Sequence, residues 1–504
     1  MSEKQYFIGV NLNETHAYAV VVSENGETVA QSSSAFEAPK NHTAKAIDNK
    51  GEIENICEQS CESWWRAVCN ALGHISTQIR GKLDTKNLAG ISVSSEPGHI
   101  AVVDRSGASL YPAIMAADNR AEDQTIRLNG VGQEHVRKVG YPFRSTDAIA
   151  KIVWIKENEP DIYENAIFVH QADYILGKLK GKMDVTNASI AVATGCDPEE
   201  DCWPDWLDYD MHLSVRERLP RLAETGQRVG YVTPIASQNV GLPAGLPVVL
   251  GCSSQTAAFL ASGARNPGDF FTVFGDVMQI DGISRNVIPY SRNIVKMNRL
   301  PEREWFFSTQ TNTGTEWINV WFNEQLAKEN LDTIERLLPS HYLAYPNVRR
   351  GEIFPFNSNS AEGFISPATD NRPVQFAACV QGTALMERLI YQIIDDLTDN
   401  SSPGNIYTVG RWCESDIWMQ CRSNITGRVL HRLTRSHEIG FGAAFAAAIG
   451  AKFGSLQEAS DAMIHIEQSF YPNPDKSAAY RECYENFLTT MEEQGYLLPQ
   501  PVLR

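Results

Sequence analysis

Side chains that could bind charge or move protons gather in short polar turns, each directly after an apolar segment. The run Asn11-Leu12-Asn13-Glu14-Thr15 follows the apolar residues 6–10, and Gly251-Cys252-Ser253-Ser254 follows the apolar residues 246–250. Such turns can offer amide, hydroxyl and carboxylate oxygens to a ligand. We therefore expect the chemistry of this chain at the ends of buried strands.

The elements that must position these turns recur in the two halves of the chain. Apolar, β-branched residues at 6–10 and 17–22 predict two strands around the first turn. Residues 270–274 and 278–283 predict a hairpin around Gly275-Asp276. Long helical patterns follow at 376–397 and 441–453.

Two similar α/β halves, rather than a long repeat array, explain this recurrence. Proline and glycine cluster at 243–247, which predicts a boundary there. We expect an N-terminal domain of residues 1–246 and a C-terminal domain of residues 247–504.

General catalytic and metal-binding motifs are absent from the sequence. It contains no GxxxxGK[ST], no HExxH, no GxSxG and no zinc-type cysteine and histidine spacing. Cys57, Cys61 and Cys69 could be imagined as metal ligands, but their spacing favours a buried helical stripe beside Trp64 and Trp65. Gly440-Phe441-Gly442 favours close helix packing over dinucleotide binding. We predict no resident protein-bound metal site.

Composition limits the classes of partner. The 504 residues include 44 Lys+Arg and 61 Asp+Glu, a net charge of −17, and 43% are hydrophobic. This balance indicates a folded protein and disfavours nucleic acid and anionic membranes as partners. Ten cysteines are too sparse for a disulfide scaffold, and the first residues lack a signal-peptide pattern. We expect a reduced, cytoplasmic protein.

The order of short segments along the chain resembles the FGGY family of carbohydrate kinases. In the first half these segments are Gly90-Ile91-Ser92-Val93-Ser94, Asp104, Pro112-Ala113-Ile114, Asp118-Asn119-Arg120 and Lys151-Ile152-Val153-Trp154. In the second half they include Pro247-Val248-Val249, Pro267-Gly268-Asp269, Thr311-Asn312, Gly314, Trp317, Gly351-Glu352, Gly410, Ser415, Trp418 and Gly442-Ala443-Ala444. The resemblance extends over nearly the whole length.

This resemblance implies an α/β fold of two actin-like, ribonuclease-H-like domains with a ligand cleft between them. It places the sugar on the N-terminal side and the nucleotide on the C-terminal side. The family reaction is ATP-dependent phosphorylation of a ketose or polyol hydroxyl, with Mg²⁺ on the phosphates. The implied partners are a small sugar or polyol and a nucleotide.

The resemblance also assigns roles to individual residues. Asn11 and Ser254 stand where the family has a phosphate-side Asp and a catalytic Asp base. The substrate-binding positions are Glu96, His99, Asp118 and Arg120. The nucleotide-binding positions are Asn13, Glu14, Thr15, Gly275, Asp276, Gly410, Arg411 and Ser415.

Several of these positions depart from the family pattern. Asn11 and Ser254 have lost carboxylates, while Glu14 and Asp276 add negative charge where phosphate oxygens would lie, which argues against binding of ATP and Mg²⁺. A sugar kinase whose catalytic residues have changed in this way would need another base, for which Glu96, Asp276 and Asp118 are candidates. The alternatives are a non-catalytic protein that binds sugar, nucleotide or a protein partner, and a scaffold without ligand.

Structural roles compete with these functional ones. Ser254 is expected as the N-cap of the helix that starts at Gln255. Asp118 and Arg120 could form a surface charge pair, and His99 could be a hydrogen-bonded histidine at a strand end. The sequence names neither the sugar nor the oligomeric state, and a homodimer stays open.

Overall fold

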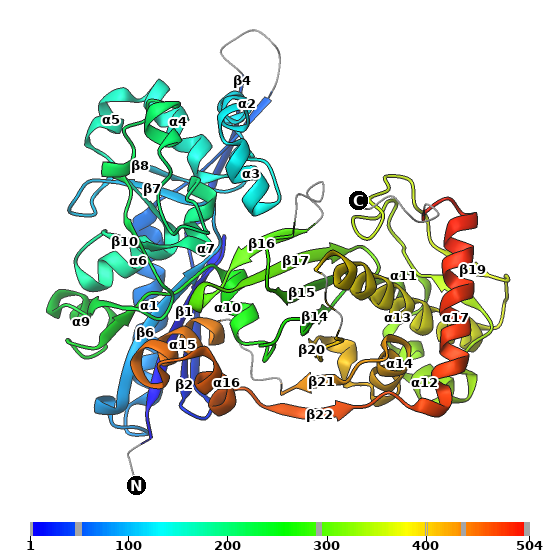
Figure 1. Ribbon diagram of the computed structural model, residues 1–504. Coiled ribbons are helices and arrows are strands. Elements are labelled where there is room, and N and C mark those ends of the chain that lie inside the picture. Colours follow the sequence, from blue (N-terminus) through cyan, green and yellow to red (C-terminus); the bar gives the residue numbers. More distant parts are fainter. Residues whose placement is uncertain are drawn as a thin grey trace. The chain divides into compact units, whose positions relative to one another are not determined.

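The first apolar segment of the chain is a central strand of a mixed six-stranded sheet (Figure 1). The computed structural model describes residues 4–45, 53–288, 295–398, 400, 402–434 and 440–497. The sheet has the strand order β12-β13-β6-β1-β2-β3. β1 (Tyr6–Leu12) pairs antiparallel with β2 (His16–Ser23) and parallel with β6 (Leu88–Ser95). β13 (Pro247–Val249) lies parallel to β6 on its other side.

Alternate residues of β1 pack against different helices. Ile8, Val10 and Leu12 share a core with buried residues of α1 (Cys61–Ile79) and α6 (Gln171–Lys180). Gly9 points to the opposite face, as side chains alternate along a strand. A Cβ on Gly9 would lie 2.1 Å from the Gly440 carbonyl oxygen at the start of α15 (Phe441–Ala448), so only glycine allows this helix to approach.

A second sheet in the same part of the chain supports the substrate-side residues. Its order is β4-β5-β8-β7-β9. Ile100 and Val102 of β7 (Ile100–Val103) pack with Ile149 and Ile152 of α4 (Ala148–Asn158). This core fixes the ends of β7 and β8 (Ser109–Ile114), where the polar segments begin.

The chain divides into two units that are each compact. Unit 1 consists of Met1–Ala261, Asn298–Glu304 and Arg435–Ile464, and unit 2 of Ser262–Met297, Trp305–Thr434 and His465–Arg504. The division into 1–246 and 247–504 stays a prediction about domains. The strand directly after it, β13, pairs within the sheet of unit 1.

The remaining strands and helices of unit 1 complete these two sheets and their cover. They are β3 (Thr28–Ala35), β4 (Lys40–Lys45), β5 (Ile53–Gln59), α2 (Glu122–Val131), α3 (Gln133–Val139), α5 (Pro160–Asn165), β9 (Ile167–His170), β10 (Val185–Asn187), α7 (Ala188–Ala191), α8 (Trp206–Tyr209), β11 (Arg221–Ala223), β12 (Arg228–Tyr231), α9 (Pro234–Val240), α10 (Ser254–Leu260) and α16 (Leu456–Met463).

Unit 2 is built on a seven-stranded sheet in the order β16-β17-β15-β14-β20-β21-β22. β14 (Phe270–Phe274) and β15 (Met278–Ser284) form the predicted antiparallel hairpin, and β20 (Ile406–Val409) pairs parallel with β14. The core includes Trp317 and Trp418, both fully buried, with ring centroids 5.9 Å apart.

The other elements of unit 2 cover or extend this sheet. They are β16 (Lys296–Arg299), whose last residues fall in unit 1, β17 (Trp305–Thr311), α11 (Glu316–Trp321), α12 (Glu324–Ile334), β18 (Leu343–Tyr345), β19 (Phe364–Ser366), α13 (Arg372–Leu397), α14 (Asp416–Thr426), β21 (Leu430–Leu433), β22 (Ile466–Phe470) and α17 (Pro474–Glu493). Among the described helices, none is both long and apolar enough to cross a membrane.

Three sequence expectations about helices have different outcomes in the structure. The predicted cysteine stripe is wrong for Cys57, which lies in strand β5, whereas Cys61 and Cys69 lie in α1. Close helix packing at Gly442 is confirmed, because a Cβ there would lie 2.1 Å from the Ala257 carbonyl oxygen of α10. The helix predicted at 441–453 ends as α15 at Ala448 and continues as a π-helical turn.

Candidate functional site

The polar turns of unit 1 meet at one edge of its sheet. β1, β6 and β13 run parallel, so their carboxyl ends lie side by side. Asn11 is in register with Ser94, and Ser95 forms a bridge with Ser253. The chain turns that follow these three strands are therefore brought together. The sequence predicted polar turns after the first and third strands, but not that these two turns meet.

Asn11 and Ser254 contact each other directly at this edge. The Ser254 hydroxyl donates to Asn11 Oδ1 at 2.7 Å, and the Ser94 hydroxyl donates to the same oxygen at 2.8 Å. Both lone pairs of the Asn11 carbonyl oxygen are thus engaged by neutral hydroxyls. The centre of the candidate site is an uncharged, hydrogen-bonded trio.

The prediction that Ser254 caps α10 is wrong. Ser253 is the N-cap, and its hydroxyl oxygen accepts from the Thr256 backbone N–H at 3.1 Å. Ser254 is the first helical residue, so its side chain is released from capping and is directed to Asn11. Because the cap lies one residue earlier than expected, Ser254 is a candidate site residue and not a structural one.

The turn between β1 and β2 is closed by its own side chain. Asn13 Oδ1 accepts from the backbone N–H groups of Thr15 at 2.9 Å and His16 at 2.8 Å. This is an Asx turn, in which the side chain uses donors that would otherwise face outward. The turn assigned to phosphate binding therefore offers fewer backbone donors than its length suggests.

Glu14, Glu96 and His99 form a cluster beside this turn. Carboxylate oxygens of the two exposed glutamates and a ring nitrogen of buried His99 lie within 4.8 Å of one another. Burial, and then the charge of Glu14, raise the pKa of Glu96. The structure thus brings together residues that the sequence assigned separately to nucleotide and sugar.

The ring of His99 presents an N–H group, rather than a metal-binding lone pair, at its unpaired nitrogen. Its Nδ1 accepts from the Ala116 backbone N–H at 2.9 Å, which places the proton of the neutral ring on Nε2. Burial lowers the pKa of His99 to about 3, so the ring is neutral at ordinary pH. Nε2 has no hydrogen-bond partner among the described residues, so His99 is only half satisfied.

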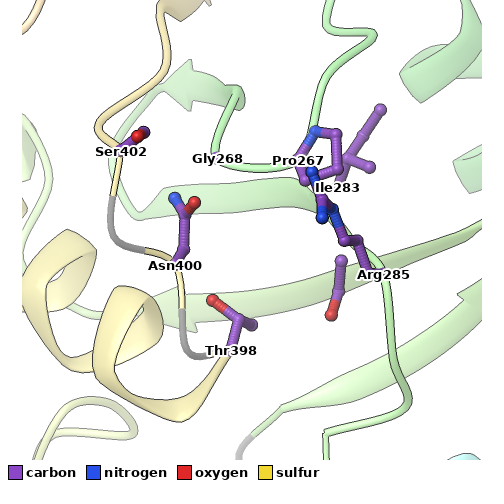
Figure 2. Close-up of a pocket in the computed structure, with 8 residues that line it drawn as sticks. Pro267, Gly268, Ile283, Arg285, Thr398, Asn400 and Ser402 are labelled. Atoms are coloured by element: carbon purple, nitrogen blue, oxygen red, sulfur yellow. The ribbon is translucent and has the colours of Figure 1, made fainter.

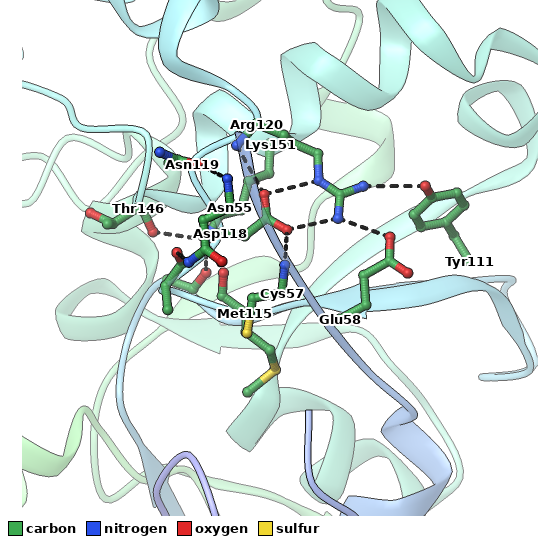
Figure 3. Close-up of polar contacts among 12 residues, drawn as sticks. Asn55, Cys57, Glu58, Tyr111, Met115, Asp118, Asn119, Arg120, Thr146 and Lys151 are labelled. Carbon is green, nitrogen blue, oxygen red and sulfur yellow. Dashed lines mark hydrogen bonds and ion pairs between the residues drawn. The ribbon is translucent and has the colours of Figure 1, made fainter. Parts of the chain in front are cut away.

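Asp118 and Arg120 form a buried ion pair (Figure 3). The surface-pair alternative is wrong, because Asp118 is fully buried and Arg120 is 5% exposed. Arg120 Nε and Nη2 donate to the two Asp118 oxygens at 2.9 and 2.7 Å. The Cys57 N–H donates to Asp118 Oδ2 at 2.7 Å, and the Arg120 N–H donates to Oδ1 at 3.0 Å.

The rest of the Arg120 guanidinium is also engaged. It donates to Glu58 at 2.8 Å and to the Tyr111 hydroxyl at 3.2 Å, and it lies 4.9 Å from the centre of the Trp154 ring. Burial opposes its charge, but the hydrogen bonds and charge of Asp118 outweigh burial and raise the pKa of Arg120. A direct substrate contact by Asp118 or Arg120 stays a prediction.

In unit 2, the predicted nucleotide residues lie on neighbouring strand ends. Gly275 follows β14 and Gly410 follows β20, its parallel neighbour. Gly410 has φ +136°, and a Cβ there would lie 2.2 Å from the Phe274 carbonyl oxygen. Asp276 is exposed, and Gly314 packs so closely that its Cβ would lie 2.3 Å from the Asp276 carbonyl oxygen.

Arg411 and Ser415 have protein partners. Arg411 forms an ion pair with Glu324, and the Ser415 oxygen caps α14 by accepting from the Trp418 N–H at 3.3 Å. Their roles toward a nucleotide stay predictions, as do those of the other assigned residues.

A small cavity of unit 2 lies away from these strand ends (Figure 2). Its volume is about 180 Å³, and it is lined by Pro267, Gly268, Ile283, Ser284, Arg285, Thr398, Asn400 and Ser402. Gly268 precedes β14, whereas Gly275 follows it, so the cavity is at the other end of this strand. It contains none of the predicted site residues.

Sequence reasoning missed two groups that organise the site of unit 1. Ser94 holds Asn11, and Lys151 holds backbone carbonyl groups beside His99. Period-two alternation in residues 88–95 could have indicated the orientation of Ser94. No local pattern could have indicated the partners of Lys151, which are 5, 36 and 53 positions away.

Comparison with known proteins matches both halves of the chain to one family. Residues 6–261 match the N-terminal domain of the FGGY family of carbohydrate kinases, and residues 301–451 match its C-terminal domain. A xylulose kinase of Lactococcus lactis is 24% identical over 492 residues, covering 95% of each chain.

Solved structures show the same two-domain, actin-like fold. The xylulose kinase of Rhodospirillum rubrum superimposes with a TM-score of 0.77 at 21% identity, covering 97% of this chain and 99% of that one. The glycerol kinase of Plasmodium falciparum with ADP gives a TM-score of 0.79 at 15% identity, covering 98% and 99%. The chain belongs to the FGGY family of carbohydrate kinases.

Proposed function

We propose that this family member binds a small sugar or polyol and transfers phosphate to it slowly or not at all. The observation that carries the proposal is the 2.7 Å contact between Ser254 and Asn11. Both residues stand where the family resemblance places aspartates, and neither side chain has a charge. A ketose or polyol is supported as ligand by family membership and by relatives such as the xylulose kinases.

A neutral Ser254–Asn11 pair lacks a base for the sugar hydroxyl. A positioned carboxylate base contributes about 10²–10⁴-fold to such a reaction. The Ser254 hydroxyl is as hard to deprotonate as the acceptor hydroxyl itself, and it is already committed as a donor to Asn11. It can orient an acceptor but cannot take up its proton.

FGGY kinases use ATP with Mg²⁺. The residues at the carboxyl end of β1 suit neither the metal nor the phosphates well. Mg²⁺ prefers carboxylate and phosphate oxygens with octahedral geometry. Asn11 offers a neutral oxygen that already accepts two hydroxyl hydrogen bonds. His99 Nδ1 accepts from the Ala116 N–H, which leaves the proton on Nε2 and no free lone pair on the ring for a metal. Asn13 uses two N–H groups of the turn, and Glu14 adds a repelling charge.

A slow but working kinase is the second candidate, and the position of Glu96 favours it. Glu96 is exposed at the strand-end edge, and its raised pKa makes it a better general base than an ordinary glutamate. Asp118 is a poorer replacement, because four donors occupy its two oxygens. Asp276 lies in unit 2 and is exposed.

Restoring the two carboxylates tests the proposal. We expect the Asn11→Asp and Ser254→Asp double variant to raise acceptor-dependent ADP release by at least about 100-fold, given the usual size of the base effect. Glu96→Gln should leave the restored activity within a few-fold, as should Glu122→Gln, a matched change of an exposed glutamate on α2. Wild-type turnover that Glu96→Gln abolishes and Glu122→Gln preserves would establish the second candidate instead.

A further inference from the structure

Lys151 of α4 is a buried amine that joins three separate segments of unit 1. Its side chain is fully buried. Nζ donates to the backbone carbonyl oxygens of Gly98 at 2.8 Å, Met115 at 2.8 Å and Thr146 at 2.9 Å (Figure 3). The three acceptors come from the turn after β6, the end of β8 and the loop before α4.

These three segments also contact one another tightly. Gly98 has φ +95°, and a Cβ there would lie 2.7 Å from the Thr146 carbonyl oxygen and 3.3 Å from the Ala116 Cβ. The Ala116 N–H donates to His99 Nδ1, and the chain neighbours of these two residues, Met115 and Gly98, provide two of the three carbonyl groups that Lys151 binds. The orientation of the His99 ring therefore depends on the same junction.

The number of donors on Lys151 matches the number of acceptors. An ammonium group has three N–H donors, and here each finds one carbonyl oxygen. A methionine would fill the same space without the desolvation cost of a buried amine. The property that distinguishes Lys151 is thus its three hydrogen bonds, not its volume.

We propose that Lys151 is a positioning residue for the acceptor side of the site. By holding Gly98, Met115 and Thr146 together, it fixes the Glu96–His99 turn so that the imidazole is presented in one orientation. Only the expected effect of Lys151 on acceptor affinity rests on the proposed sugar-binding function. Its effect on the turn itself is independent of that function.

Lys151→Met removes the three donors and keeps an unbranched side chain of similar volume. Hydrogen–deuterium exchange of peptides covering residues 96–99 and 114–118 should become at least about 10-fold faster, and the His99 ring resonance should shift. Lys156→Met is the matched control, because Lys156 lies on the same helix but donates to the His212 carbonyl oxygen instead. The control should leave both peptides at wild-type rates.

Ligand binding gives a second, separable result. For a sugar or polyol that binds the wild type, we expect Lys151→Met to raise the acceptor Kd about 10-fold and to leave the Kd of ADP unchanged. If no acceptor binds the wild type, the sugar-binding function fails, but exchange and the His99 resonance still decide the positioning role. Wild-type exchange and an unshifted His99 in a folded Lys151→Met protein would overturn the proposal.

The wild type alone provides the test if Lys151→Met does not fold. Burial lowers the pKa of Lys151 to about 7. Below this pH the ammonium has three donors, and above it the neutral amine has two, so one carbonyl loses its partner. The protection factors of both peptides, relative to β2, should therefore fall between pH 6 and pH 8.5.

Six other titratable groups lie near Lys151 on the segments that pack around it: Cys57, His99, Asp118, Arg120, Asp147 and His170. Burial lowers the pKa of His99 and His170 to about 3 and raises that of the Cys57 thiol, so these three stay neutral through this range. Protection that stays constant while the ¹⁵Nζ resonance of Lys151 shows the ammonium losing its proton would contradict the positioning role.

Discussion

Two polar regions of unit 1 differ in which of their side chains are charged. In the buried network, Asp118 and Arg120 keep their charges, and each oxygen and nitrogen between them has a partner (Figure 3). At the strand-end edge, Asn11 and Ser254 are neutral, while the charged Glu14 lies close to Glu96. The charges of the buried network hold the fold, whereas the two positions at which the family resemblance places aspartates are uncharged. Retention of the fold therefore does not imply retention of the reaction.

The largest expected effect comes from the buried network. Asp118→Asn should lower the free energy of unfolding by about 3–5 kcal/mol, because it leaves a buried guanidinium with incomplete charge compensation. Chemical denaturation followed by circular dichroism would measure the loss. The matched exposed pair is Arg66 with Glu37, whose side chains are 62% and 64% exposed.

Arg66→Met should cost no more than about 1 kcal/mol, since exposed ion pairs contribute little. Equal losses for Asp118→Asn and Arg66→Met would show that the buried network is not a stability determinant. The contrast between the two polar regions would then fail.

A smaller effect is expected at the first turn. Asn13→Gly frees the N–H groups of Thr15 and His16, and Glu14→Thr removes a negative charge. Together they should tighten binding of ADP about 10-fold, or about 1.4 kcal/mol, as measured by titration calorimetry. Asp276→Thr would test the corresponding turn of unit 2.

Asn25→Gly in the turn between β2 and β3 is the control for this change, because it alters a similar turn outside the site. Unchanged or weaker ADP binding in the Asn13→Gly, Glu14→Thr protein would mean that the first turn does not limit nucleotide affinity.

The smallest effect separates two adjacent serines. Ser253→Ala removes the cap of α10 and should destabilise unit 1 by about 1 kcal/mol. Ser254→Ala leaves the cap in place and should cost less. A thermal melt of both variants distinguishes them, and the reverse order would restore Ser254 as the capping residue.

Much of the fold could be predicted from local patterns. The strands at 6–10 and 17–22, the hairpin around Gly275 and the long helix α13 follow from alternation, turn residues and helical period. The contact between Asn11 and Ser254 joins residues 243 positions apart, so local patterns could not show it. Asn11 and Ser254 themselves were found through the family resemblance.

Other parts of the site depended on tertiary contacts. Asp118 and Arg120 look like surface residues in the sequence, and only the packing of β5, β8 and α4 around them makes them buried. The cap of α10 was misplaced by one residue because two serines precede the helix and either could cap it. The closing of the first turn by Asn13 depends on a side-chain rotamer, which sequence does not specify.

Turnover of the unmodified protein tests the central claim most directly. The measurement is coupled ADP release with ATP·Mg²⁺ across a panel of pentuloses, hexuloses and polyols. We predict no acceptor-dependent rate above background, because the neutral Asn11 and Ser254 pair provides no base. A turnover of about 1 s⁻¹ or faster, within the range of working kinases, would contradict the account and show that another residue supplies the base.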